Sequence, residues 1–291
     1  MSQEYVSYKG YIFPAMSTSV MDLEFAENEL QVRDNDIFNI TYPKSGTTWM
    51  IEILSLIQTK GDPKWCKEVP NWDRGPWIEA PGVAEKVQQN QADQRILSSH
   101  LPKKVFCKSF AGSKAKVVYT ARHPKDVVVS FYYFAKMSAF FKDPENFDQF
   151  LKDFLAGELP YGSWFDHIKG WMEMSGKENF LFNTYEDLKK DLRGSVKRIS
   201  QFLGKDLDDA ALDSVVNHVS FKIMKENKMA NFTLVPDTYM DHDKSPFMRK
   251  GIVGDWKNHF TVAQSELFDE IYKERMKDFK MKLPWDEHLS E

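Results

Sequence analysis

A short turn rich in lysine, serine, glycine and threonine joins a strand-like run to a helix-like run, and its residue types suit a bound phosphate. This phosphate turn reads Thr41-Tyr42-Pro43-Lys44-Ser45-Gly46-Thr47-Thr48-Trp49. Residues 37–40 are largely apolar and residues 50–57 are apolar at helical spacing, so the last amides of the turn would begin a helix. Free N–H groups and the positive dipole end at that point favour an anion. Gly46 permits close approach of the backbone, Lys44 adds a charge, and Trp49 offers a face to a base. Hydroxyl donors come from Ser45, Thr47 and Thr48.

The residue order of the phosphate turn differs from that of the common metal-dependent nucleotide-binding loop. In that loop a Gly directly precedes the Lys, and a Ser or Thr after the Lys holds magnesium. Here Lys44 comes two residues before Gly46, and no obvious magnesium-binding carboxylate follows a predicted strand. The turn can therefore hold an adenosine phosphate without a metal, and a nucleotide kinase is the weaker interpretation. A plain helix cap remains the alternative for the turn taken alone.

A second basic segment lies far along the chain and also suits a small anion. This basic segment reads Arg249-Lys250-Gly251-Ile252-Val253-Gly254-Asp255-Trp256. Two adjacent cations run into two glycines, which free the backbone to wrap around an anion as a nest of N–H groups. A solvated basic loop is the usual interpretation of a Lys/Arg pair, but the glycine spacing and the closing Trp256 favour a phosphate site.

Both segments, in this order, resemble motifs of the cytosolic sulfotransferases. The phosphate turn resembles their 5′-phosphosulfate loop, and the basic segment resembles their 3′-phosphate motif. The resemblance implies a donor, 3′-phosphoadenosine 5′-phosphosulfate (PAPS), a product, adenosine 3′,5′-bisphosphate (PAP), and no metal. It implies in-line displacement at sulfur, in which positioning and charge stabilisation dominate and Lys44 meets the charge on the leaving phosphate oxygen. Residues 44–49 and Arg249, Lys250 and Gly251 would bind the donor.

Residues 117–126 repeat the strand-to-helix pattern and supply further donor contacts. Arg122 ends the strand-like run, and its guanidinium fork suits a phosphate, while Ser130 lies two helical turns beyond. The resemblance implies that Arg122 and Ser130 bind the 3′-phosphate. Many relatives have Asn where this chain has His123, which leaves the local hydrogen bonding open.

Two more segments are assigned to the donor by resemblance alone. Tyr185 matches the tyrosine of the family near the adenine, although a lone Tyr between a strand and a helix is more often a structural residue. Phe221 would stack on the base opposite Trp49. Without the resemblance its segment would be taken as an amphipathic helix end. The cofactor segment comprises Ser220, Phe221, Lys222, Ile223, Met224 and Lys225.

His100 is the candidate for acid–base chemistry. It ends the run Ile96-Leu97-Ser98-Ser99-His100-Leu101-Pro102, at the carboxyl edge of a predicted strand. An imidazole with an ordinary pKa of about 6.5 can accept a proton and release it afterwards. A single His is more often structural, but the His-Leu-Pro context resembles the general base of the family, so His100 would deprotonate the acceptor.

Apolar side chains in segments expected near the base indicate a hydrophobic acceptor. These are Pro14, Trp72, Trp77, Phe131, Phe134, Met137 and Phe140, several of which could be plain core. Residues 72–77, 161–167 and 224–229 resemble the hydroxysteroid branch of the family. Ser98 agrees, because phenol-type relatives often have Lys two residues before the catalytic His. A steroid or sterol-like alcohol is expected, with a phenol or amine as the alternative acceptor.

The segment 257–266 resembles the short dimer motif of the family, with Lys257, Thr261, Val262 and Glu266 in the expected order. It predicts a homodimer with a small interface. Taken by itself, the segment would be an exposed turn before a helix over 266–278. From another class of protein, a non-catalytic adenosine-phosphate sensor is the rival hypothesis, and the presence of His100 and Lys44 opposes it.

The elements that must position these residues alternate along the chain. Strands are predicted over 37–41, 96–99, 117–120 and 180–183, and helices over 48–58, 125–137, 147–155, 163–174, 188–203 and 208–219. Alternation predicts an α/β sandwich with a largely parallel sheet, whose ligands lie at the carboxyl ends of the strands. The resemblance implies a three-layer fold like that of P-loop kinases, in a single domain over residues 1–291.

Composition bounds the remaining classes. With 291 residues, 42% of them hydrophobic, the chain can bury a sizeable core. A net charge of −4 argues against a nucleic-acid partner. The longest apolar stretch, residues 127–135, is far short of the ~20 residues that a membrane span needs. The first residues lack the pattern of a secretion signal, and two cysteines without CxxC spacing predict neither a disulfide framework nor a zinc site. A cytoplasmic protein is expected.

Overall fold

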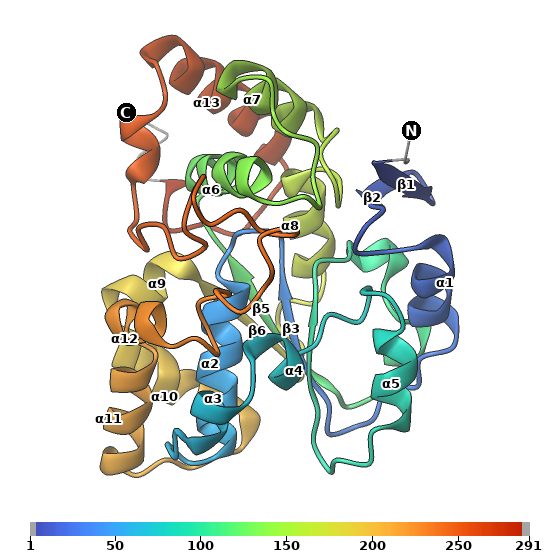
Figure 1. Cartoon of the computed structure of the whole chain (residues 1–291), viewed down its shortest axis with the longest axis vertical. Helices are drawn as coiled ribbons and strands as arrows, with labels where there is room; N and C mark the ends of the chain where they lie inside the picture. The colour runs from blue at the N-terminus through green and yellow to red at the C-terminus, as the bar shows by residue number, and fades with distance from the viewer. Residues whose placement is uncertain (1–3, 287–291) are drawn as a thin grey trace.

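Four parallel strands form the central sheet, in the order β4-β3-β5-β6 (Figure 1). The computed structural model describes residues 4–286. The strands are β3 (Ile37–Thr41), β4 (Ile96–Ser99), β5 (Lys116–Ala121) and β6 (Phe180–Thr184). Strand β3 pairs with β4 and β5, with Ile37 opposite both Ile96 and Lys116. The four strands predicted from the sequence are confirmed, as is the parallel sheet.

Both faces of the sheet are covered, because alternate strand residues point into two separate apolar clusters. Phe38, Ile40 and Tyr119 belong to one buried cluster, and Ile37 and Val118 belong to the other. Strands buried on both faces in this way are typical of parallel sheets between helical layers. The result is the predicted three-layer α/β sandwich.

The helices divide between these two faces. The first cluster is covered by α1 (Val20–Asn28), α5 (Val83–Gln89), α6 (Pro124–Met137), α7 (Phe147–Ala156), α8 (Trp164–Met172) and α13 (Val262–Met276). The second is covered by α2 (Thr47–Gln58), α3 (Lys64–Glu68), α9 (Tyr185–Lys190), α10 (Leu192–Leu203), α11 (Asp209–His218) and α12 (Phe221–Glu226). The remaining elements are the antiparallel pair β1 (Tyr5–Tyr8) and β2 (Tyr11–Pro14), the turn α4 (Asn71–Arg74), and the 3-10 helices η1 (Lys103–Val105), η2 (Lys108–Phe110) and η3 (Asp255–Asn258).

Two helix predictions are wrong in detail. The single helix expected over 188–203 is broken at Asp191, whose extended backbone ends α9 while its carboxylate accepts the N–H of Gly194 and caps α10. A side chain at position 194 would collide with that carboxylate, so Gly194 permits the cap. Helix α13 starts at Val262 rather than 266, because Thr261 and Gln264 form a capping box. Strands β1 and β2, helix α1 and the three helices between residues 64 and 89 were not predicted from the sequence.

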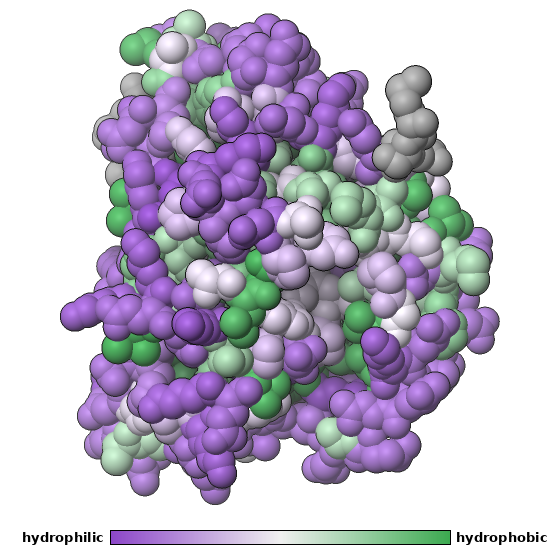
Figure 2. Space-filling view, in the orientation of Figure 1, coloured by the Kyte–Doolittle hydropathy of each residue, from purple (hydrophilic) through white to green (hydrophobic). Residues whose placement is uncertain are grey.

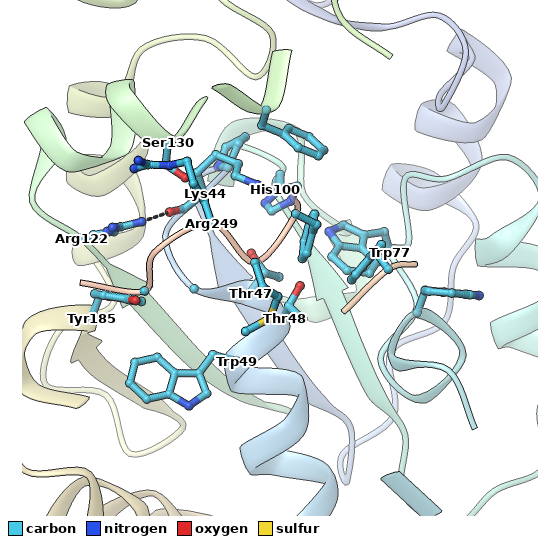
Figure 3. Close-up of a pocket in the computed structure, with 18 of the residues that line it drawn as sticks. Lys44, Thr47, Thr48, Trp49, Trp77, His100, Arg122, Ser130, Tyr185 and Arg249 are labelled. Carbon is cyan, nitrogen blue, oxygen red and sulfur yellow. Dashed lines mark hydrogen bonds between the residues drawn. The ribbon is translucent and has the colours of Figure 1, made fainter. Parts of the chain in front are cut away.

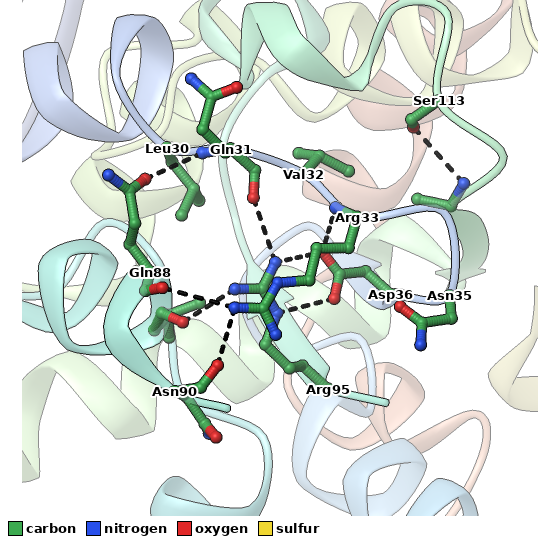
Figure 4. Close-up of polar contacts among 12 residues, drawn as sticks. Leu30, Gln31, Val32, Arg33, Asn35, Asp36, Gln88, Asn90, Arg95 and Ser113 are labelled. Carbon is green, nitrogen blue, oxygen red and sulfur yellow. Dashed lines mark hydrogen bonds and ion pairs between the residues drawn. The ribbon is translucent and has the colours of Figure 1, made fainter. Parts of the chain in front are cut away.

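A buried polar cluster joins the starts of β3 and β4 (Figure 4). Asp36 directly precedes β3, and its carboxylate pairs with the guanidinium of Arg95, which directly precedes β4. Arg95 also donates to the carbonyl oxygen of Gln31, and the backbone N–H of Arg33 donates to Asp36. Because both charges are buried, paired and hydrogen-bonded, the cluster holds together the amino-terminal ends of these two strands, opposite the carboxyl ends.

Within residues 4–286, no helix combines the length and the apolar character needed to cross a membrane.

Candidate active site

A cavity of about 370 Å³ opens at the carboxyl edge of the sheet, where the phosphate turn, His100 and the basic segment meet. Figure 2 shows a hollow near the middle of this face, with apolar and intermediate side chains around it. Figure 3 shows Arg122, Ser130 and Arg249 on one side of Lys44, and His100 and Trp77 on the other. Segments from most of the chain therefore contribute to one site.

The phosphate turn has the conformation of a tight loop that leads into a helix. Lys44 has a φ of 68° and Gly46 a φ of 105°, and Gly46 is the N-cap of α2. A left-handed lysine costs about 1–2 kcal/mol of backbone strain, so the surrounding structure must hold it there. The hydroxyl oxygen of Ser45 is buried and has no hydrogen-bond partner. Gly46, Thr47 and Thr48 at the start of α2 do line the cavity, and the free N–H groups of a helix N-terminus are what a bound phosphate would satisfy.

Arg122 connects the phosphate turn to the basic segment. Its Nη1 donates to the carbonyl oxygen of Lys44 at 3.0 Å, and its Nη2 donates to the carbonyl oxygen of Ile252 at 3.3 Å. Its Nε is buried without a partner, and the guanidinium lies 4.3 Å from the centroid of the Tyr185 ring. Arg122 therefore holds two loops in place and keeps N–H groups for an anion.

The cations of the basic segment are oriented by a carboxylate. Arg249 and Lys250 each form an ion pair of 2.7 Å with Asp255, which is 2% exposed. Gly251 packs directly on the ring of Phe221, where a Cβ atom would lie 2.2 Å from Phe221 Cδ2. The motif therefore requires glycine at 251 for close packing against α12.

Aromatic rings form a slot next to these cations. The rings of Trp49 and Tyr185 meet edge to face with centroids 5.2 Å apart, and Trp49 Nε1 donates to the carbonyl oxygen of Val219. Phe221 also lines the cavity. Flat apolar faces beside a phosphate site suit a nucleotide base.

Lys44 extends its ammonium group into the cavity between two phenyl rings. The Nζ atom lies 3.7 Å from the centroid of Phe134 and 4.7 Å from that of Phe247. Burial, together with the nearby charges of Arg122 and Arg249, lowers the pKa of Lys44 to about 7. The site is thus poor in negative charge and would be stabilised by an anion.

The ring of His100 is held so that one nitrogen faces the cavity without a proton. Nδ1 lies 2.9 Å from the carbonyl oxygen of Thr41, which can only accept a hydrogen bond, so Nδ1 carries the proton. Nε2 is therefore the basic nitrogen. Burial lowers the pKa of His100 to about 4, aided by the charge of Lys44, so the imidazole is neutral at physiological pH. This is the protonation state that a general base needs.

His100 is held by Glu79 and His167, which no motif revealed, and by Thr41, the first residue of the phosphate turn. The carboxylate of Glu79 accepts the backbone N–H of His100 at 2.7 Å, and burial raises the pKa of Glu79 to about 7. His167 Nε2 lies 3.2 Å from the carbonyl oxygen of His100. The Thr41 hydroxyl lies 3.2 Å from His100 Nδ1 and 2.6 Å from the Thr47 hydroxyl. The base and the first residue of α2 therefore share one hydrogen-bonded chain.

The structure brings most of the predicted donor residues to the cavity. Its wall includes Lys44, Gly46, Thr47, Thr48, Trp49, Arg122, Ser130, Tyr185, Phe221, Met224, Arg249, Lys250 and Gly251. Ser45 of the phosphate turn does not line the cavity, because its side chain is fully buried. The rest of the cofactor segment, Ser220, Lys222, Ile223 and Lys225, does not line it either. The reason is that α12 turns one face to the cavity, and Ser220 caps that helix through the N–H of Ile223.

The predicted acceptor residues divide in the same way. Trp72, Trp77, Phe134 and Phe140 line the cavity. Phe131 is fully buried in the core, because α6 turns residues 130 and 134 to the cavity and residues 127 and 131 away from it. Pro14 is buried in the hairpin opposite Tyr5, and Met137 lies behind the wall, packed with Phe232 and Met240.

Other residues of the acceptor wall were not among the predicted acceptor residues, although Tyr161 begins one of the segments that resemble the hydroxysteroid branch. They are Ser17, Ala80, Phe141, Tyr161, Phe232, Met240, Phe247 and Met248. For Phe247 and Met248, the one sign in the sequence was their position directly before the basic segment.

Together, the parallel sheet and the site at its carboxyl edge define an α/β protein that binds an anionic, base-bearing ligand beside a neutral imidazole. Comparisons with known proteins make this class specific. A family model described as a sulfotransferase domain matches residues 34–280. Sulfotransferase 2B1 of Homo sapiens is 54% identical over 99% of this chain and 78% of that protein. The chain belongs to the sulfotransferase family.

Two further relatives agree with this assignment. The 3-beta-hydroxysteroid sulfotransferase of Cavia porcellus is 49% identical over 99% of this chain and 100% of that protein. The crystal structure of mouse sulfotransferase SULT7A1 complexed with PAP matches with a TM-score of 0.79 at 30% identity, and covers 98% of each chain. The resemblance stated from the two phosphate motifs is thus confirmed.

Proposed function

We propose that residues 1–291 form one sulfotransferase domain, which moves the sulfuryl group of PAPS to the hydroxyl of a hydrophobic acceptor, a hydroxysteroid or sterol-like alcohol. The observation that carries the proposal is the meeting of three cations with one unprotonated imidazole nitrogen in a single cavity. The cations are Lys44, Arg122 and Arg249.

The two phosphate motifs support binding of the donor at both ends. The phosphate turn, with Lys44, Gly46 and the start of α2, would hold the 5′-phosphosulfate. Arg122, Ser130 and the basic segment would hold the 3′-phosphate, and the slot between Trp49, Tyr185 and Phe221 would hold adenine. Arg122 lines the cavity and its Nε has no hydrogen-bond partner, which fits such a ligand, because a phosphate would supply an acceptor for the guanidinium.

The reaction follows from the positions of His100 and Lys44. The acceptor oxygen attacks sulfur, the bond from sulfur to the 5′-phosphate oxygen breaks, and His100 Nε2 takes the proton of the acceptor hydroxyl. The ammonium of Lys44 and the N–H groups at the start of α2 stabilise the charge on the leaving phosphate. Burial is the main cause of the low pKa of His100, and the charge of Lys44 adds to it. Negative charge on the bound donor offsets the charge of Lys44, so the base becomes stronger when the donor is present.

The acceptor wall supports an apolar alcohol. Its side chains are mainly aromatic and aliphatic, with Trp72, Trp77 and Phe232 among them. The two curated relatives described above include a protein named for 3-beta-hydroxysteroids, and Ser98 stands where phenol-type relatives often have Lys. A phenol or an amine is the second candidate acceptor.

An assay with sulfate-labelled PAPS and a panel of acceptors tests the proposed reaction. We expect hydroxysteroids and sterols to have a higher kcat/KM than simple phenols or amines, because the wall offers a large apolar surface. The assay is run with and without a chelator. If the enzyme prefers a phenol, the proposed acceptor class is wrong. If it transfers sulfate to no acceptor, a non-catalytic sensor is favoured. If the reaction strictly requires magnesium, a kinase is favoured.

Replacing the base tests the mechanism. His100→Ala should lower kcat by about 10²–10⁴, the usual effect of losing a general base, while PAP still binds. His218→Ala is the matched control, since His218 bonds to its own helix at Ser214 and should leave turnover unchanged. Turnover in His100→Ala equal to that of the wild type would remove His100 from the mechanism.

The lowered pKa of Lys44 predicts proton uptake when PAP binds. Near pH 8 the empty site holds Lys44 mostly neutral, since its pKa is about 7, and the phosphates of PAP raise that pKa toward its ordinary value. Binding should therefore take up close to one proton at pH 8 and less at pH 6, where Lys44 is already charged. Calorimetry in buffers of different ionisation enthalpy measures this uptake. Lys44→Met should abolish it, and its absence in the wild type at pH 8 would contradict the assigned charge state.

We also propose a homodimer through the segment with Lys257, Thr261, Val262 and Glu266. Val262 supports it, because this apolar side chain is 76% exposed at the start of α13. Val262→Glu should shift the protein toward the monomer in light scattering, whereas Met21→Glu, at an equally exposed apolar site on α1, should not. A wild-type monomer at high concentration would refute the dimer. The family resemblance also supports a cytoplasmic location, which cell fractionation would test.

A further inference from the structure

A buried carboxylate next to Arg122 holds the backbone of the basic segment. Asp126 lies in the first turn of α6 and is 1% exposed. Its Oδ2 accepts the N–H of Gly254 at 2.7 Å, and its Oδ1 accepts the N–H of Trp256 at 2.9 Å. Both oxygens are thus used to fix two backbone positions, one on each side of Asp255.

Asp255, between those two positions, pairs with the cations of the basic segment. Its Oδ2 pairs with Arg249 Nη2 and its Oδ1 pairs with Lys250 Nζ, both at 2.7 Å. His259 Nε2, at 3.1 Å, contacts the same carboxylate. Burial alone would raise the pKa of Asp255, but hydrogen bonds from Lys250, Asn258 and Arg249 hold that pKa well below its usual range. Asp255 is therefore ionised and orients both cations.

Further contacts join the start of α6 to the chain after the basic segment. Lys125 Nζ donates to the hydroxyl of Ser265 at 2.8 Å and lies 4.3 Å from the centroid of the Trp256 ring. The rings of His123 and Trp256 stack with centroids 5.8 Å apart. These contacts thus hold the end of the strand that carries Arg122 and the segment that carries Arg249 in a fixed position relative to each other.

We propose that Asp126 and Asp255 form a carboxylate clasp that sets the affinity for the 3′-phosphate of the donor. Asp126 binds the backbone of residues 254–256 to the helix that follows Arg122. Because Asp255 lies in that backbone and pairs with Arg249 and Lys250, the positions of these two cations are fixed as well. Both are positioning residues, and neither needs to touch the ligand. The inference rests on the proposed function, since it assumes that the 3′-phosphate lies among Arg122, Arg249 and Lys250.

The clasp has this effect because the direct hydrogen bond from Arg122 to the basic segment is long, and the contacts of His123 and Lys125 reach the side chain of Trp256 rather than the backbone of the segment. Among the contacts of Arg122, its bond to the carbonyl oxygen of Ile252 is 3.3 Å long, whereas the two bonds of Asp126 are shorter and charge-assisted. Without Asp126, two N–H groups would lose their acceptor and the segment would move away from Arg122. Pre-organised donors would then become mobile, and a ligand would have to order them on binding.

Asp126→Asn tests the proposal, because it keeps the size of the side chain but places an amide where one backbone N–H must be accepted. Calorimetry measures the Kd of two ligands, PAP and adenosine 5′-monophosphate, which lacks the 3′-phosphate. We expect Asp126→Asn to raise the Kd of PAP at least tenfold and that of the monophosphate less than twofold. Asp22→Asn is the matched control, since Asp22 accepts the backbone N–H groups of Ser19 and Gly82 in the same way but away from the cavity. It should change neither Kd.

If Asp126→Asn raises the Kd of both ligands equally, the proposal is overturned, because a general loss of structure affects binding with and without the 3′-phosphate. An unchanged Kd for both ligands would overturn it as well. If this variant does not fold, Asp255→Asn provides the same comparison, since it breaks the ion pairs of Arg249 and Lys250 but leaves the bonds to Asp126. A loss confined to PAP supports the clasp, and an unchanged ratio of the two Kd values refutes it. A wild-type protein with no preference for PAP over the monophosphate would instead refute the proposed donor site itself.

Discussion

The rest of the site depends on the positive charge gathered around the guanidinium of Arg122, where the two phosphate motifs meet. The guanidinium donates to the carbonyl oxygen of Lys44 in the phosphate turn and to that of Ile252 in the basic segment, and so joins parts of the chain that are far apart in sequence. The arrangement concentrates positive charge, since Lys44 and Arg249 lie close enough to Arg122 to affect the pKa of the lysine. Such a cluster costs free energy without a ligand, and an anion with two phosphate groups relieves it.

The base is controlled by backbone groups and buried neighbours rather than by an ionised partner at its ring. A carbonyl oxygen, that of Thr41, fixes which nitrogen of His100 carries the proton. Glu79 and His167 hold the peptide groups of His100 from opposite sides. The hydroxyls of Thr41 and Thr47 extend this network to the start of α2, so the position of the base and the position of the phosphate turn are determined together.

Features encoded within short stretches of sequence were predictable, and those made by distant segments were not. The phosphate turn, the four strands and the basic segment follow from local residue types, and the structure confirms the strands and brings the two motifs to one cavity. Asp191 was taken as part of a helix because helical periodicity does not reveal that a carboxylate will cap the next helix. Glu79 contacts His100 across 21 positions of sequence, and Asp126 contacts Gly254 across 128, so no pattern near either residue predicts its role. Phe131 was misplaced because which side of α6 faces the core depends on packing, not on composition.

Phe134 and Phe247 belong to the acceptor side and the donor side of the cavity at once. The same rings that line the acceptor side lie against the ammonium of Lys44 on the donor side. A substitution at either ring that widened the range of alcohols would also change the dielectric surroundings of the lysine and the ease with which it gains a proton. In this chain, a change in the range of alcohols accepted is therefore coupled to a change in the charge state of the lysine that serves the donor.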